Sequence, residues 1–109
     1  MLFRSYEVTT ASNSAECLEV ITAQDFDLVI LDIIMPDVDG IEVLARIKKL
    51  RDDTEVIMIT GHGDLDLAIK SVKYEATDFV TKPINDEVLE IALNRAQERI
   101  AMQIGRAHV

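Results

Sequence analysis

Two short runs of apolar side chains stand out along the chain, at Leu28–Leu31 and Val56–Ile59. Both are rich in branched residues and nearly uninterrupted, which is typical of parallel strands that are buried on both faces. Weaker strand patterns cover residues 6–10 and 78–81. The pattern therefore predicts two buried parallel strands and two weaker candidates for further strands.

The stretches between these strands repeat apolar side chains every three or four residues, as half-buried helices do. Asn13 and Asp39 are each followed three residues later by a glutamate, a spacing at which cap and acid exchange hydrogen bonds with free backbone N–H groups. Helices are therefore predicted to start there, with a third opened by Asp64 and a fourth over about 86–104. Their expected inner faces are Cys17, Leu18 and Ile21; Ile41, Leu44 and Ile47; Leu65, Ala68, Ile69 and Val72; and Leu89, Ala92, Ala96 and Ile100.

The alternation of strands and helices implies parallel crossover connections. The predicted fold is α/β, a doubly wound parallel sheet with helices on both faces. With 109 residues and 49% apolar content, the chain has room for one domain with one core. We assign this domain to residues 1–104 and a tail without pattern to residues 105–109. The last helix is longer than one layer requires, so it either frays or connects to an output domain that this chain does not include.

Composition narrows the possible functions. The formal charge of −9, from 20 acidic and 11 basic side chains, repels a polyphosphate backbone and disfavours direct nucleic-acid binding. No apolar run reaches the roughly 18 to 20 residues of a membrane span, and we expect a soluble, cytoplasmic domain. Cys17 is the single cysteine, which leaves no internal disulfide and no thiolate zinc site. Its place in a helical apolar pattern favours packing over reactivity.

Three polar residues follow successive predicted strands, namely Asp32, Thr60 and Lys82. In an open parallel sheet the carboxyl ends of the strands meet at one edge, and ligands bind there. A carboxylate that can attack, with a hydroxyl and an ammonium group that can hold the transferred oxygens, forms a coherent set for phosphoryl transfer. Each residue alone has an ordinary structural role, so the hypothesis rests on their shared location.

The sequence around these residues resembles the response regulator receiver family of two-component signalling systems, from about residue 6 to about residue 100. The order, spacing and strand context of the motifs agree, and the resemblance implies a flavodoxin-like fold. It also implies that the Lys82–Pro83 peptide bond is cis, as is frequent in this family. The matching segments are Leu28–Asp37, Asp39–Gly40, Ile59–Asp64 and Asp78–Pro83.

By this resemblance, Asp32 would take a phosphoryl group from a phosphohistidine on a sensor histidine kinase or a phosphotransfer protein. Thr60 would donate a hydrogen bond to one phosphoryl oxygen, and Lys82 would neutralise another. Mg²⁺ would be held by Asp32 and by the backbone carbonyl of Ile34. Phe79 takes the place of the aromatic residue whose rotamer reports activation, although it also suits an ordinary core position. Such a domain is a bacterial signalling module that promotes its own phosphotransfer and is not a conventional enzyme.

The chain departs from the family pattern at its start. Receivers open with a strand that ends in two acids, which hold Mg²⁺. Nothing before Tyr6 supplies this pair, and Glu7 lies inside the next strand pattern. The resemblance thus implies a receiver fold that lacks the first strand and most of the first helix, with an incomplete Mg²⁺ site. Sheet edges would be exposed, so we expect a homodimer or a strand-exchanged oligomer. Glu75 replaces a usual glycine, which predicts strain in a left-handed turn.

Two other functions compete with that of a phospho-accepting switch. A degenerate receiver would bind its partners without phosphorylation. A phosphatase of the haloacid dehalogenase type would also use Asp32, but it needs a second aspartate two residues later, where this chain has Ile34. The sequence contains no Gly-rich nucleotide loop, which argues against an NTPase. His62, between two glycines, fits an exposed loop residue better than a catalytic acid or base.

Overall fold

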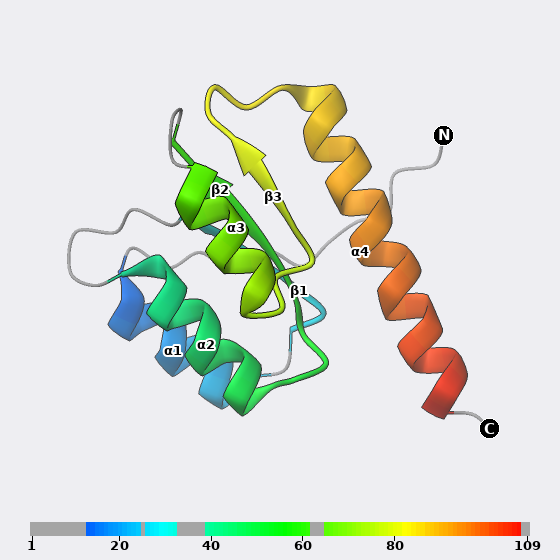
Figure 1. Ribbon diagram of the computed structural model, residues 1–109. Coiled ribbons are helices and arrows are strands. Elements are labelled where there is room, and N and C mark those ends of the chain that lie inside the picture. The colour runs from blue at the N-terminus through cyan, green and yellow to red at the C-terminus, as the bar shows by residue number, and fades with distance from the viewer. Residues whose placement is uncertain (1–12, 25, 33–38, 62–64, 108–109) are drawn as a thin grey trace.

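The computed structural model describes residues 13–24, 26–32, 39–61 and 65–107. Helices and strands alternate along this part of the chain (Figure 1). The strand predicted over residues 6–10 lies outside the described residues, as do Ile34, His62 and the expected cap Asp64. The elements are α1 (Ser14–Ala23), β1 (Leu28–Asp32), α2 (Gly40–Leu50), β2 (Glu55–Thr60), α3 (Leu65–Lys73), β3 (Asp78–Thr81) and α4 (Asp86–Ala107).

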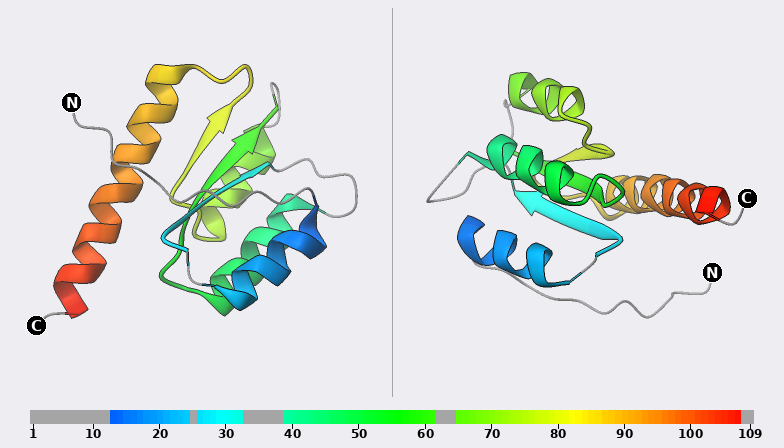
Figure 2. Two further views of the ribbon diagram at one scale, coloured as in Figure 1. Left: turned by 180° about the vertical axis from the view of Figure 1, so that it is seen from behind. Right: turned by 90° about the horizontal axis from the view of Figure 1, so that it is seen from below.

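The three described strands form a parallel sheet in the order β1-β2-β3. The central strand β2 is buried along its whole length, which explains its unbroken run of branched side chains. Helices α1, α2 and α3 lie on one side of the sheet, and α4 lies on the other (Figure 2). The predicted α/β class with a parallel sheet is therefore confirmed. Helix α4 ends at Ala107, three residues beyond its predicted end.

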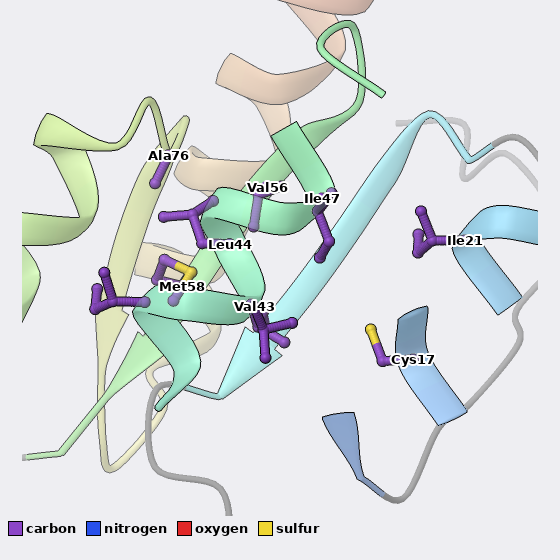
Figure 3. Packing of buried hydrophobic residues seen from close by; sticks show 10 residues of the cluster. Cys17, Ile21, Val43, Leu44, Ile47, Val56, Met58 and Ala76 are labelled. Atoms are coloured by element: carbon purple, nitrogen blue, oxygen red, sulfur yellow. The ribbon is translucent and has the colours of Figure 1, made fainter. Parts of the chain in front are cut away.

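Alternate residues of β2 contribute to two separate cores. Val56 and Met58 face α1 and α2, where Leu44 and Ile47 are fully buried and Cys17 completes the layer (Figure 3). On the opposite face, a second cluster joins the sheet to α4 and consists of Ile57, Ile59, Val80, Ala92 and Ala96. The two small alanines let the axis of α4 lie close to the sheet, as the inner stripe predicted from the sequence requires.

Two of the predicted helix starts are confirmed by their capping bonds. Asn13 Oδ1 accepts a hydrogen bond from the Glu16 N–H at 2.8 Å, which satisfies one free donor of α1. Asp39 caps α2, but its Oδ1 accepts from the Ile41 N–H at 2.9 Å instead of from the third residue. The capping residues could thus be predicted more reliably than the donors that they bind.

The prediction for the inner face of α3 is confirmed for Ala68 and wrong for Ile69 and Val72. Ile69 and Val72 are 58% and 53% exposed, whereas Ala68 and Ser71 are buried. The Ser71 hydroxyl donates to the Ala68 carbonyl at 2.6 Å, so this polar side chain is buried without losing its hydrogen bond. Helix α3 packs through Ala68, Ser71 and the partly buried Leu67, whereas Ile69 and Val72 point outward.

Strand β1 is an edge strand of the described sheet. Ile30 is 51% exposed, although its partner in the register, Ile57, is fully buried. Helix α4 packs on β2 and β3, and no other described helix covers β1 on that face (Figure 2). Among the described residues, this face of β1 is therefore left uncovered at Ile30.

The turn after α3 adopts the left-handed conformation that was predicted at Glu75. Its φ is +71°, a value that costs little only for glycine. Two hydrogen bonds define the turn, from the Ala76 N–H to the Ser71 carbonyl and from the Glu75 N–H to the Val72 carbonyl, both at 3.0 Å. These are the two bonds of a Schellman motif, in which glycine is the usual residue at this position.

Candidate functional site

Asp32, Thr60 and Lys82 meet at the carboxyl edge of the sheet, as their positions after successive strands predicted. Asp32 is the last residue of β1 and pairs in register with Ile59, so Thr60 lies one residue further along β2. Lys82 follows β3 directly, and its backbone N–H donates to the Thr60 carbonyl at 2.8 Å. The backbone of the sheet therefore fixes where each of the three side chains starts.

An ion pair joins the first and third of these residues. Lys82 Nζ lies 2.7 Å from Asp32 Oδ2 and donates a hydrogen bond to it. The two side chains remain 48% and 39% exposed respectively, so a partner in solution can reach the carboxylate. The Lys82–Pro83 peptide bond is cis, as the family resemblance implied. The arrangement offers a nucleophilic oxygen beside a fixed positive charge.

The hydroxyl group of Thr60 has unused hydrogen-bonding capacity. The residue is fully buried, and its Oγ1 has no hydrogen-bond partner among the described residues. Leaving a buried hydroxyl without a partner costs the folded state about 1–3 kcal/mol of stability. Such groups are therefore rare and call for a physical reason. A phosphoryl oxygen bound at this edge would supply the missing acceptor.

The described residues do not complete a magnesium site. They contain no group of three or more His, Cys, Asp or Glu side chains that could hold a metal ion. Mg²⁺ prefers octahedral coordination by hard oxygen atoms. Asp32 is a suitable ligand by type, and the predicted carbonyl ligand Ile34 lies outside the described residues.

Phe79, the predicted switch residue, is the second residue of β3 and lies three residues before Lys82. Its ring is half-buried and packs against the core between the sheet and α2. Its backbone N–H donates to Asp78 Oδ1 at 2.8 Å, and Asp78 Oδ2 pairs with Arg95 of α4 at 2.9 Å. The environment suits a core aromatic, and the residue as a whole is only partly buried.

A polar cluster at the opposite, amino end of the sheet was not predicted. Glu55 opens β2 and is fully buried, yet its carboxylate accepts hydrogen bonds from the Thr77 hydroxyl and from Arg99 Nε, the latter at 3.2 Å. The signal in the sequence is an acid that directly precedes an apolar strand. This cluster ties β2 to the loop before β3 and to α4.

Cys17 takes the structural role that its helical pattern predicted. Its side chain is 9% exposed and packs in the core beneath α1. Burial raises the pKa of the Cys17 thiol above its ordinary value, because the thiolate would lose hydration. The thiol is therefore poorly suited to nucleophilic chemistry at neutral pH.

Comparison with known proteins agrees with this architecture. The sequence profile of the response regulator receiver domain family matches residues 3–94. The transcriptional regulatory protein GlrR of Escherichia coli K12 is 35% identical over 96 residues, which are 88% of this chain and 22% of the relative. FixJ of Bradyrhizobium diazoefficiens is 33% identical over 96 residues, or 84% of this chain and 47% of FixJ. The chain thus spans between about a fifth and a half of these regulators.

Solved receiver structures superpose well on the chain. The receiver domain of NtrX from Brucella abortus has a TM-score of 0.80 at 34% identity, covering 85% of this chain and 79% of that domain. A response regulator receiver domain protein from Clostridium thermocellum has a TM-score of 0.82 at 41% identity, with coverages of 89% and 79%. Among the described helices, none is both long and apolar enough to cross a membrane.

Proposed function

We propose, from the premise that this chain belongs to the response regulator receiver domain family, that Asp32 accepts a phosphoryl group from a sensor histidine kinase. Receiver domains are signalling domains that interact with histidine kinases or phosphotransfer proteins. The observation that carries the proposal is the meeting of three groups at one edge of the sheet. These are an accessible Asp32 carboxylate, the Lys82 ammonium group and the Thr60 hydroxyl, which has no hydrogen-bond partner among the described residues. The setting of this exchange would be the bacterial cytoplasm.

The proposed chemistry needs one bond to form and one to break. An Asp32 carboxylate oxygen would attack the phosphorus of a phosphohistidine, and the O–P bond would form as the N–P bond breaks. The imidazole nitrogen would leave with the electron pair, and Asp32 would become an acyl phosphate. Lys82 is near enough to transfer its hydrogen bond to a phosphoryl oxygen, and Thr60 would donate to another.

Magnesium enters this proposal only as a property of the family. Receiver domains generally bind Mg²⁺ for phosphorylation, and the ion then offsets the charge of the phosphoryl group. Asp32 would be one ligand, and the backbone carbonyl of Ile34 is a second candidate. Because the described residues do not complete the coordination, we expect Mg²⁺ to bind weakly to this chain and phosphorylation to be slow.

Phe79 is proposed as the residue that senses the event. Its half-buried ring lies three residues before Lys82 on the same chain segment, so a change in the Asp32–Lys82 pair reaches it through a short stretch of backbone. Rotation of the ring would alter the packing on the face of the sheet that α1, α2 and α3 cover. An output domain beyond this chain would read that change.

A degenerate receiver that acts without phosphorylation is the second candidate function. The observation that favours it is the incomplete metal coordination among the described residues. In that case the domain would still fold and bind partners, whereas Mg²⁺ and phosphodonors would leave it unchanged. Rate and stoichiometry of phosphorylation therefore separate the two functions.

The test combines a magnesium titration with intact-protein mass spectrometry after incubation with acetyl phosphate. We expect slow labelling of the wild-type chain that rises with Mg²⁺ concentration and is lost in Asp32→Asn, because an amide cannot form the acyl phosphate. Asp37→Asn serves as the matched control and should keep the label. A chain that never takes a label at saturating Mg²⁺ supports the degenerate receiver, and label that persists in Asp32→Asn refutes the assignment of the acceptor.

A further inference from the structure

The apolar core that holds α4 on the sheet contacts the first part of this helix. The α4 side chains that belong to the core cluster or pack against it are Leu89, Ala92, Leu93 and Ala96. All four lie before residue 97, whereas α4 continues to Ala107. The last turns of α4, drawn in red, extend away from the sheet (Figures 1 and 2). The apolar cluster therefore fixes α4 up to Ala96 and leaves its later turns to other contacts.

An ion pair reaches α4 beyond this core. Arg99 Nε donates a hydrogen bond to Glu55 Oε1 at 3.2 Å, three residues after Ala96. The two partners differ in their surroundings, because the Glu55 side chain is fully buried whereas the Arg99 side chain is 54% exposed. A fixed acid inside the fold therefore holds a base that stands at the surface.

The sheet positions Glu55 without help from α4. The Glu55 N–H donates to the Asp27 carbonyl at 3.0 Å, and its carboxylate accepts a hydrogen bond from the Thr77 hydroxyl. Thr77 is itself tied to β2, since its N–H donates to the Val56 carbonyl at 2.8 Å and its hydroxyl accepts from the Val56 N–H at 3.2 Å. The carboxylate therefore keeps its place and one hydrogen bond when Arg99 moves away.

We propose that the Glu55–Arg99 ion pair is a latch that closes the last turns of α4 onto the sheet, and that residues 97–107 open as a unit when it is released. In the closed state the guanidinium group of Arg99 binds the Glu55 carboxylate. In the open state the carboxylate keeps the hydrogen bond from Thr77, and the guanidinium group returns to water. Opening breaks no strand pairing and leaves Ala92 and Ala96 in the core, so the rest of the fold stays intact.

The burial of Glu55 makes the latch stronger than an ordinary surface ion pair. Arg46 and Glu42 of α2 lie closer together, at 2.7 Å, but their side chains are 57% and 48% exposed. Water competes for such exposed groups, and their pairing adds little. The Glu55 carboxylate has lost its water, so the loss of a charged donor is more costly there. Releasing the latch should therefore change the population of the open state by roughly tenfold or more.

The latch lies at the end of the sheet opposite to the candidate phosphorylation site. Glu55 is the first residue of β2, and Thr60 is the last residue of the same strand, next to Asp32 and Lys82. Opening of the latch moves none of these three side chains. The latch therefore controls where α4 ends relative to the sheet, and it does so whether or not Asp32 accepts a phosphoryl group.

Hydrogen exchange of backbone amides, followed by NMR on the full chain, tests the latch residue by residue. Arg99→Met keeps the apolar stem and the helix propensity but removes the guanidinium group. Glu55→Gln keeps an acceptor for the Thr77 hydroxyl but removes the charge that holds Arg99. Each variant should speed exchange of the amides of residues 97–104 at least about tenfold, with exchange of the β2 amides unchanged.

Three further variants separate the latch from a general loss of stability. The double variant of Glu55→Gln and Arg99→Met should exchange no faster than either single variant, because both remove the same contact. Arg99→Lys keeps a positive charge and should retain most of the protection. Arg46→Met is the matched control, since it removes an exposed ion pair on α2 and should leave exchange in α4 unchanged.

Each outcome decides for or against the latch. Faster exchange that is confined to the residues after Ala96, with non-additive single variants, supports it. The proposal is overturned if exchange accelerates equally throughout the fold, if the two single variants are additive, or if the wild-type amides after Ala96 have no protection. Should circular dichroism show that Glu55→Gln does not fold, Arg99→Met and Arg99→Lys still decide, because they change an exposed side chain.

Discussion

Replacing Glu75 by glycine should stabilise the fold. Glu75 occupies the left-handed position of the Schellman motif after α3, with φ at +71°. In this region the Cβ of an L-residue lies too close to the following carbonyl oxygen, and glycine has no Cβ. The Glu75 side chain is exposed, so its removal leaves no cavity.

The size of the effect follows from two opposing terms. Relief of the left-handed conformation is worth about 1–2 kcal/mol, whereas the greater freedom of glycine in the unfolded chain costs roughly 0.4–1 kcal/mol. The free energy of unfolding should therefore rise by about 1 kcal/mol. For a domain of this size, that raises the midpoint of thermal unfolding by roughly 4–8 °C.

Urea and thermal unfolding, followed by circular dichroism, measure this change. Two controls isolate its cause. Glu75→Ala removes the same charge but keeps a Cβ, so it should leave the stability within about 0.5 kcal/mol of the wild type. Lys73→Gly places glycine in the last turn of α3 and should lower the stability by up to about 1 kcal/mol. Equal stabilisation by Glu75→Ala and Glu75→Gly would show that charge removal, and not backbone conformation, is responsible.

Three further perturbations have expected outcomes. Lys82→Ala should change the free energy of unfolding by less than about 1 kcal/mol, because its ion pair with Asp32 is solvent-exposed. The same substitution should slow phosphorylation by acetyl phosphate. A large loss of stability in urea melts would contradict the expected small change in the free energy of unfolding. Glu55→Ala should lower the free energy of unfolding by about 1–3 kcal/mol, since it removes a charged acceptor from the Thr77 hydroxyl, and urea unfolding would expose the error if the change were negligible. Cys17 has a pKa raised by burial, so its contribution to stability is complete below the ordinary value of 9.0 and is lost as pH rises through the folded pKa. Urea melts from pH 7 to 10.5 should therefore show a loss of stability in the wild type that Cys17→Ala does not share. Equal pH dependence of the two proteins would show that the thiol is solvated.

The elements that carry strong local signals could be predicted from the sequence. The two apolar runs predicted β1 and β2 correctly as strands. A strand buried on both faces needs branched side chains at every position, which holds for β2, whereas β1 has Ile30 exposed among the described residues. Asn13 and Asp39 marked helix starts because a cap satisfies free N–H groups within its own helix. The shared edge of Asp32, Thr60 and Lys82 followed from strand order alone.

Features that depend on tertiary packing could not be predicted from the sequence. Helix α3 buries Ala68 as predicted, but it buries Ser71 and leaves Ile69 and Val72 exposed, because contact with the sheet favours small residues there. The acid before the strand did not predict that Glu55 is buried, since its burial depends on partners more than twenty residues away. The 2.7 Å ion pair between Lys82 and Asp32 is likewise a product of the fold.

Mapping the phosphoryl group to one residue tests the central claim most directly. The chain is incubated with acetyl phosphate and saturating Mg²⁺, the acyl phosphate is trapped by reduction with borohydride, and the modified peptide is sequenced by tandem mass spectrometry. The account predicts that the trapped residue is Asp32, at low stoichiometry, and that the signal vanishes in Asp32→Asn but persists in Asp37→Asn. Trapping at another residue, or no trapped residue in the folded wild-type chain, would contradict the claim that Asp32 is the phosphoryl acceptor.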